Sequence, residues 1–243
     1  MSGFRRPSWW ALLLTVVAAL LFIRLGIWQL HRADFKDALL RRYAAAATAP
    51  VQAFAQVADV PPQDGFPRVR VSGRYLADRI YLLDNPRHDE RGGVEVFVPL
   101  ALRGTSQLLL VDLGFLPGNG TDQAPSLPAL PSTEVSLQGL YEPPPPIGFQ
   151  MGGNALQQQT RWPKRSIFLD LAEVARDLHR TLYPRVLALD PDPASIYVRV
   201  HIMDFSAMPP ARHRAYAFQW FTFALAAVVL LLVLHRKRGR RRH

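Results

Sequence analysis

Two segments near the ends of the chain are apolar enough to cross a bilayer. The first covers residues 9–30, with Arg24 as its one charged residue, and the second covers residues 215–234, with none. At about 1.5 Å of rise per residue, they span roughly 33 Å and roughly 30 Å, against a hydrocarbon core of about 30 Å. The pattern predicts two transmembrane helices, the first prolonged into water by an Ala-rich stretch that ends near Ala47.

A cleaved signal peptide is the alternative for the first segment, because Arg5 and Arg6 precede its apolar run. Cleavage normally follows a pair of small residues separated by one position. The sequence from Arg24 to Gln29 offers no such pair, and the Ala-rich stretch lies too far downstream. We therefore expect the segment to remain as an anchor.

Between the two segments, apolar and polar positions alternate as they do in half-buried strands. Val69, Val71 and Tyr75 share one face of the first such run, and arginines occupy the other. The predicted strands cover residues 68–75, 79–83, 94–100, 108–116, 135–141 and 195–204. The apolar positions expected in their core are Val69, Val71, Val96, Val98, Ile196, Val198 and Val200. Short turns favour antiparallel pairing, and about six strands can curl toward a barrel.

One helix is expected among these strands. Asp170 and Glu173 match a helix N-cap and its capping-box partner. The apolar residues that follow are spaced so that they would lie on one face of a helix; they are Leu171, Val174, Ala175, Leu178 and Leu182. We therefore predict an α+β membrane protein, in which two transmembrane helices flank a mostly antiparallel, barrel-like β domain outside the cytoplasm with one or two helices.

The net charge of +10 belongs to the ends of the chain. All 19 acidic residues lie between residues 31 and 212, and an equal number of Lys and Arg residues balances them there. The excess positive charge comes from Arg5, Arg6, Arg24, Arg214 and the tail 236–242. Positive charge beside a membrane segment favours the cytoplasmic side, and it gives no support here for nucleic-acid binding. The expected divisions are a cytoplasmic N-terminus over 1–8, helices over 9–30 and 215–234, an outer domain over 31–212 with its core over about 55–205, and a cytoplasmic tail over 235–243.

The common catalytic and metal-binding patterns are missing from the sequence. It contains no cysteine, and its seven histidines form no HExxH or His-x-His motif, so a zinc site has little support. No GxSxG motif and no phosphate-binding loop is present. We therefore expect a protein that is not an enzyme.

Polar and aromatic residues gather where both predicted helices meet the outer face of the membrane. They are Trp28, Gln29, His31 and Arg32 on the first helix, and Arg212, His213, Tyr216, Gln219 and Trp220 on the second. An ordinary interfacial belt accounts for the Trp, Tyr and Arg side chains. The amides of Gln29 and Gln219 are costly in hydrocarbon unless they are paired. We therefore expect Gln29 to bond across to the second helix.

These two motifs resemble those of the Surfeit locus protein 1 family of cytochrome c oxidase assembly factors. The first reads Gly26-x-Trp28-Gln29-Leu30-x-Arg32-x-x-x-Lys36, and the second reads His213-x-x-Tyr216-Ala217-x-x-Trp220-Phe221. Weaker matches follow in the family's order: Gly73-x-Tyr75, Asn85-Pro86-Arg87, Gly93-x-x-Val96-x-x-Pro99-Leu100, Gly114-Phe115-x-Pro117, Gly139, Asp170-Leu171 and Leu182-x-Pro184. One departure is Asp112-Leu113-Gly114-Phe115, where the family usually reads Asn-Arg-Gly-Trp.

The resemblance implies a role in inserting or retaining haem a in the catalytic subunit of a haem-copper oxidase. It implies that His213 binds the haem iron, that the catalytic subunit and the haem a synthase are partners, and that the protein lies in a bacterial inner membrane. A neutral imidazole is a suitable axial ligand. Arginines could pair with the haem propionates and aromatic rings could flank the macrocycle. These residues are Arg32, Arg212, Trp28, Tyr216 and Trp220.

His31 is a candidate for a second axial ligand, because antiparallel helices would place it at about the depth of His213. An ordinary interfacial histidine is the alternative. Two other functions also remain open at this point: a membrane scaffold that holds oxidase subunits without haem, and an extracytoplasmic enzyme.

Overall fold

The computed structural model describes residues 7–236, except residue 64 and the ranges 89–90, 119–125, 146–153 and 200–207. Arg5, Arg6 and the tail beyond Arg236 lie outside the described residues. The chain divides into two compact units. The helical unit comprises residues 1–40 and 206–243, and the barrel unit comprises residues 41–205.

Two long helices form the helical unit. Helix α1 covers Trp9–Ala47, so its last turns belong to the barrel unit, and helix α3 covers Pro210–His235. No proline interrupts α1, whereas α3 begins at a proline, a residue that suits the first turn of a helix. Both helices are long and apolar enough to cross a membrane. The two apolar helices and the continuation of the first to Ala47 are thus confirmed.

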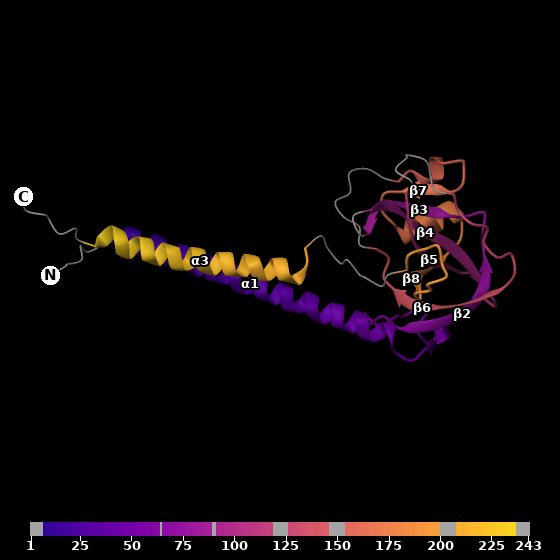
Figure 1. Cartoon of the computed structure of the whole chain (residues 1–243), viewed down its shortest axis with the longest axis horizontal. Helices are drawn as coiled ribbons and strands as arrows, with labels where there is room; N and C mark the ends of the chain where they lie inside the picture. Colours follow the sequence, from indigo (N-terminus) through magenta and orange to yellow (C-terminus); the bar gives the residue numbers. More distant parts are fainter. Residues whose placement is uncertain are drawn as a thin grey trace, which may run out of the picture. The chain divides into compact units, whose positions relative to one another are not determined.

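The barrel unit is built on eight strands: β1 Gln52–Ala53, β2 Arg68–Tyr75, β3 Tyr81–His88, β4 Arg91–Leu102, β5 Leu108–Pro117, β6 Val135–Glu142, β7 Lys164–Ser166 and β8 Leu182–Leu189. They pair in the order β1-β2-β6-β8-β5-β4-β3-β7, and a further pairing of β2 with β4 closes five of them, β2, β6, β8, β5 and β4, into a barrel (Figure 1). Within this ring only β5 and β8 are parallel. The mostly antiparallel, barrel-like domain is confirmed.

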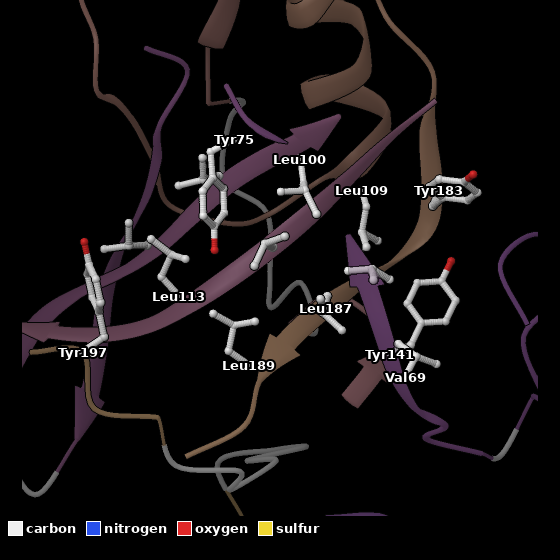
Figure 2. Packing of buried hydrophobic residues seen from close by; sticks show 14 of the residues in the cluster. Val69, Tyr75, Leu100, Leu109, Leu113, Tyr141, Tyr183, Leu187, Leu189 and Tyr197 are labelled. Carbon is white, nitrogen blue, oxygen red and sulfur yellow. The ribbon is translucent and has the colours of Figure 1, made fainter. Parts of the chain in front are cut away.

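The barrel interior holds the main hydrophobic core. Figure 2 shows side chains from β2, β4, β5, β6 and β8 pointing toward one another, among them Leu100, Leu109 and Leu187. Val69, Val71, Val96 and Val98 are buried there as the alternation predicts. Burial of each such side chain contributes roughly 1.5–3 kcal/mol, so this core is the main stabilising feature of a unit that has no disulfide.

A second, smaller core covers the outer face of the sheet under helix α2, Leu171–Leu178. Val174 of α2 is 1% exposed and packs with Tyr81 and Phe97. Asp170 accepts a hydrogen bond from the Ala172 backbone N–H at 2.8 Å, which confirms it as the N-cap. Glu173 does not complete a capping box in the structure, because its carboxylate accepts a hydrogen bond from the Asn154 amide at 2.8 Å.

The sequence pattern missed strand β8, although β8 lies in the centre of the sheet. Leu182 was expected at the end of a helix, whereas α2 ends at Leu178 and Leu182 begins β8. Residues 185–189 are all buried, so this strand shows none of the alternation that marks a half-exposed strand. Pro184 also argues against a central strand, and the structure accommodates it beside a register shift in the β5–β8 pairing.

The expected strand over residues 195–204 is wrong in its described part. Only an isolated bridge between Val198 and Phe115 forms there, and residues 200–204 lie outside the described residues. Ile196, expected in the core, is 54% exposed, whereas Tyr197 is 7% exposed and belongs to the main core. An aromatic ring buries more apolar area than the neighbouring aliphatic side chains, and it determines which face of this segment packs inward.

Replacing Leu187 by Ala should destabilise the barrel unit strongly. Leu187 is fully buried in the main core, and removing such a side chain costs roughly 2–5 kcal/mol. Ile196→Ala is the matched control, since this side chain is largely exposed and should change the free energy of unfolding by less than about 0.5 kcal/mol. Urea unfolding of the full chain in detergent measures both. Equal effects would mean that β8 is not a core strand.

Candidate functional site

Helices α1 and α3 pack along a narrow seam of small and polar side chains. The buried positions of α1 in the helical unit follow one another at intervals of three or four residues, and those of α3 at intervals of four and seven residues. They are Gly26, Gln29, Ala33 and Lys36 on α1, and His213, Ala217 and Ala224 on α3. This spacing is typical of antiparallel or parallel helices that pack side by side, and small residues let the two backbones approach.

Gly26 shows how close this approach is. A Cβ atom at this position would lie 2.7 Å from Cε1 of the Phe221 ring, closer than atoms in contact can come. Three residues further along α1, the seam changes from apolar to polar. Phe22, one turn before Gly26, stacks on Trp220 with ring centroids 5.8 Å apart.

Gln29 and His213 form a buried hydrogen bond across the seam. The Gln29 Oε1 and His213 Nδ1 atoms are 2.6 Å apart, and the two side chains are 9% and 6% exposed. An amide oxygen can only accept, so Nδ1 must carry the proton and the other ring nitrogen of a neutral imidazole is left with a lone pair. The predicted bond from Gln29 to the second helix is present in the structure.

The second ring nitrogen of His213, Nε2, is buried and has no hydrogen-bond partner. It is the one buried side-chain nitrogen or oxygen without a partner in the described parts of the chain. Buried polar atoms are nearly always paired, so an exception calls for an explanation such as an absent ion or ligand. Nε2 is therefore the strongest indication of a binding function within the helical unit.

Two further contacts fix the start of α3 against α1. The Lys36 ammonium, 7% exposed, donates to the backbone carbonyl of Met208 just before α3 begins. Asp37, the next residue of α1, forms an ion pair with Arg214, the residue after His213 on α3. These contacts lie next to the Gln29–His213 pair and hold the register of the helices there. Sequence reasoning gave Lys36 no role, although its position, seven residues after Gln29, is one repeat further along the seam.

The other predicted site residues, except Trp220, lie outside the seam. Trp28, Arg32, Arg212 and Tyr216 are exposed, and Trp220 is partly buried in its contact with Phe22. The Arg32 guanidinium lies over the ring of Phe35, 5.3 Å from its centroid. The structure thus brings Gln29 and His213 together but leaves the aromatic and arginine side chains around them on the outer surface of the helix pair.

His31 does not approach His213. It is exposed, and it follows Gln29 by two residues, which is about 200° around a helix. Since Gln29 faces His213, His31 points to the far side of α1. Gln219, the other glutamine singled out in the sequence, is exposed on α3 rather than paired in the seam.

A second cluster of polar groups, which sequence reasoning missed, lies on the barrel unit. Glu95 on β4, Asp112 on β5 and Glu142 on β6 are half-buried. The Tyr43 hydroxyl, near the end of α1, donates to Glu142 Oε2 at 2.6 Å, and the Gly114 backbone N–H donates to Asp112 at 2.9 Å. Gly114 can form this turn because its φ of +114° suits glycine.

Burial raises the pKa of each of these three carboxyl groups above its usual value. It raises the pKa of Glu95 to about 10, with a further contribution from the neighbouring Asp112, and it raises the pKa of Glu142 to about 8. The pKa of Asp112 rises to about 6, because burial outweighs its hydrogen bond to Gly114 and the attraction of Arg199. No group of three or more His, Asp or Glu side chains with metal-binding geometry occurs in the part of the chain that is described. At neutral pH, Glu95 and Glu142 therefore keep their protons, whereas Asp112 is ionised and accepts the hydrogen bond from Gly114.

The barrel unit should lose stability as pH rises from about 4.5 to 8. The folded state holds a proton on Glu142 that the unfolded chain releases near pH 4.5, so the free energy of unfolding falls across this window. Glu142→Gln keeps an acceptor for Tyr43 but does not ionise, and it should reduce the slope by at most about 1.4 kcal/mol per pH unit. Urea unfolding at several pH values measures the slope, with Glu134→Gln, an acid paired to the exposed Arg103, as control. An unchanged slope in Glu142→Gln would contradict this account.

Comparison with protein-family models matches the chain to the SURF1 family over residues 16–225. No curated protein matches the chain. The matched range contains α2, the eight strands, the seam contacts and most of both long helices. Since the match covers most of the chain, this protein belongs to the SURF1 family, which is known for the assembly of cytochrome c oxidase.

Proposed function

We propose that this protein assists the insertion or retention of haem a in the catalytic subunit of a haem-copper oxidase, with His213 as a ligand of the haem iron. Membership of the SURF1 family supports the assembly role. The observation that carries the haem part is the buried Nε2 of His213, which has no hydrogen-bond partner among the described residues.

The chemistry of His213 fits a haem. Histidines that bind metals usually donate their other ring N–H to an oxygen acceptor, which fixes the ring and its tautomer. His213 has this arrangement already, since Nδ1 donates to Gln29 and Nε2 keeps its lone pair. When bound, haem supplies an iron that accepts an imidazole nitrogen as an axial ligand.

The exposed residues around the seam would hold the rest of the group. Arg32 and Arg212 are exposed on the helix pair, and an arginine pairs well with a carboxylate such as a propionate. Trp28 and Tyr216 expose aromatic rings beside the seam, while Trp220 already packs on Phe22. We do not assign His31 as the second ligand, because it lies on the opposite side of α1 from His213.

Access to Nε2 requires movement. The atom has almost no accessible surface, so iron can reach it only after the side chains that cover it have moved. The buried positions of the seam next to it are small residues, a glycine and alanines. Such an interface suits a carrier that binds its cargo for a time and then releases it to a partner.

The charge distribution supports an orientation with both termini in the cytoplasm of a bacterial cell. Basic residues flank both apolar helices at the ends of the chain, whereas residues 31–212 are neutral. We place the barrel unit on the outer side of the inner membrane, where it can meet the catalytic subunit of the oxidase. The haem a synthase is the corresponding partner on the supply side of the same transfer.

Replacing His213 by Ala should deplete the haem that copurifies with the protein by roughly tenfold or more, because the substitution removes the strongest single contact to iron. The measurement is the visible absorption spectrum of full-length protein purified from cells that make haem a. His31→Ala is the control and should retain the spectrum of the parent, since His31 points away from the seam.

Equal haem in His213→Ala and the parent, together with full oxidase activity in the cells, would overturn the haem assignment. The protein would then act as a scaffold for oxidase subunits that does not bind haem. A loss of haem in His31→Ala, with a change from a low-spin to a high-spin spectrum, would instead restore His31 as the second ligand.

A reporter fused after His243 should behave as cytoplasmic, and one inserted at residues 143–146 should behave as extracytoplasmic. Both follow from the basic residues that flank the apolar helices. Paired reporters that are active only on opposite sides of the membrane give the measurement. A cytoplasmic signal from the insertion at 143–146 would reverse the proposed orientation.

A further inference from the structure

Gln29 is placed where it can control the chemistry of His213. The two side chains come from different helices, lie 2.6 Å apart at Oε1 and Nδ1, and are both buried. An unpaired imidazole exchanges its proton between the two ring nitrogens, and only one of the resulting tautomers leaves Nε2 able to bind a metal. An acceptor placed at Nδ1 selects that tautomer.

We propose that Gln29 is a positioning residue, which holds His213 in the tautomer protonated at Nδ1 and so presents the Nε2 lone pair to an incoming haem iron. The tautomer part stands on the geometry of the seam alone. The haem part rests on the proposed function.

The surrounding contacts show that the pair is held in place from both sides. On one side, Gly26 lies so close to the Phe221 ring that a Cβ atom there would require the ring to shift. On the other, Lys36 binds the carbonyl of Met208 and Asp37 pairs with Arg214. The register of the two helices is thus fixed independently of Gln29, and the Gln29 side chain is left to orient the imidazole.

Burial gives this single hydrogen bond its importance, because Gln29 and His213 are both largely shielded from solvent. In a medium with little water, a buried polar group has few alternative partners. Without Gln29, Nδ1 would lose the one acceptor that the structure gives it, and nothing in the pair would then favour one tautomer over the other. The proton could then move to Nε2, where it would block iron binding.

The tautomer can be read without haem. The full-length chain, labelled with ¹⁵N-histidine and placed in lipid nanodiscs, gives a His213 signal that His213→Ala identifies by its disappearance. We expect the parent to carry the proton on Nδ1, Gln29→Leu to show a population protonated at Nε2, and Gln29→Glu to retain the parent state. Gln219→Leu is the matched control, because Gln219 is exposed on α3, and it should leave the signal unchanged.

Titration of the parent and the three glutamine variants with haem a tests the second part. Gln29→Leu should weaken haem affinity by roughly 10- to 100-fold, as is typical when the partner of a metal-binding histidine is lost. Gln29→Glu should restore binding and lower the reduction potential of the bound iron, since a carboxylate makes the imidazole a stronger electron donor. Gln219→Leu should bind as the parent does.

The outcomes separate this inference from the proposed function. A parent protonated at Nε2, or a Gln29→Leu variant with an unchanged tautomer, would overturn the role of Gln29 whatever haem does. A changed tautomer with unchanged haem affinity would overturn its role toward haem. If the parent binds no haem a at all, the proposed function fails, whereas the role of Gln29 in fixing the tautomer is still decided by the ¹⁵N signal.

Discussion

The hydrogen bond between Gln29 and His213 is the buried polar contact at the centre of the seam between the two long helices. In an apolar medium, helices gain little by merely covering apolar surface, so their association depends on close packing and on polar groups that need each other. Gly26 and the seam alanines provide the close packing. The buried amide and imidazole provide the second requirement, because either one alone would be a costly polar group in the bilayer region. The contacts of Lys36 and Asp37 at the start of α3 hold the helices in the same register.

Much of the fold could be predicted from the sequence because several strands have one face in the core and the other in water, which leaves a periodic pattern in the sequence. Strand β2 alternates between core and water, and its predicted bounds agree with the structure. Strand β8 could not be recognised, because residues on both of its faces are buried and the periodic signal vanishes. The strand predicted after Asp190 is wrong for the opposite reason. Apolar and polar residues alternate around Ile196, but the side chain that is buried is Tyr197. Pairing partners decide such cases, and they lie far away in the sequence.

The candidate site was only partly predictable. The cost of burying an amide in hydrocarbon was sufficient to predict that Gln29 bonds to the second helix, and the structure identifies its partner as His213. The side on which each flanking residue lies could not be obtained in the same way, because it depends on the rotation of each helix about its own axis. That rotation turns His31 away from the seam and leaves Trp28 and Tyr216 exposed. The carboxyl cluster of Glu95, Asp112 and Glu142 could not be predicted for a similar reason, because its members come from three separate strands.

Closure of the barrel also affects how the protein behaves among its neighbours. A strand at the edge of an open sheet offers unpaired backbone groups on which another chain can add a strand. Here the pairing of β2 with β4 closes the ring, and the outermost strands of the sheet, β1 and β7, have only two and three residues. These two strands offer little backbone for strand-by-strand growth into aggregates. For a protein whose task is to meet other membrane proteins during their assembly, such a closed sheet restricts association to side-chain surfaces, where contacts can be both selective and reversible.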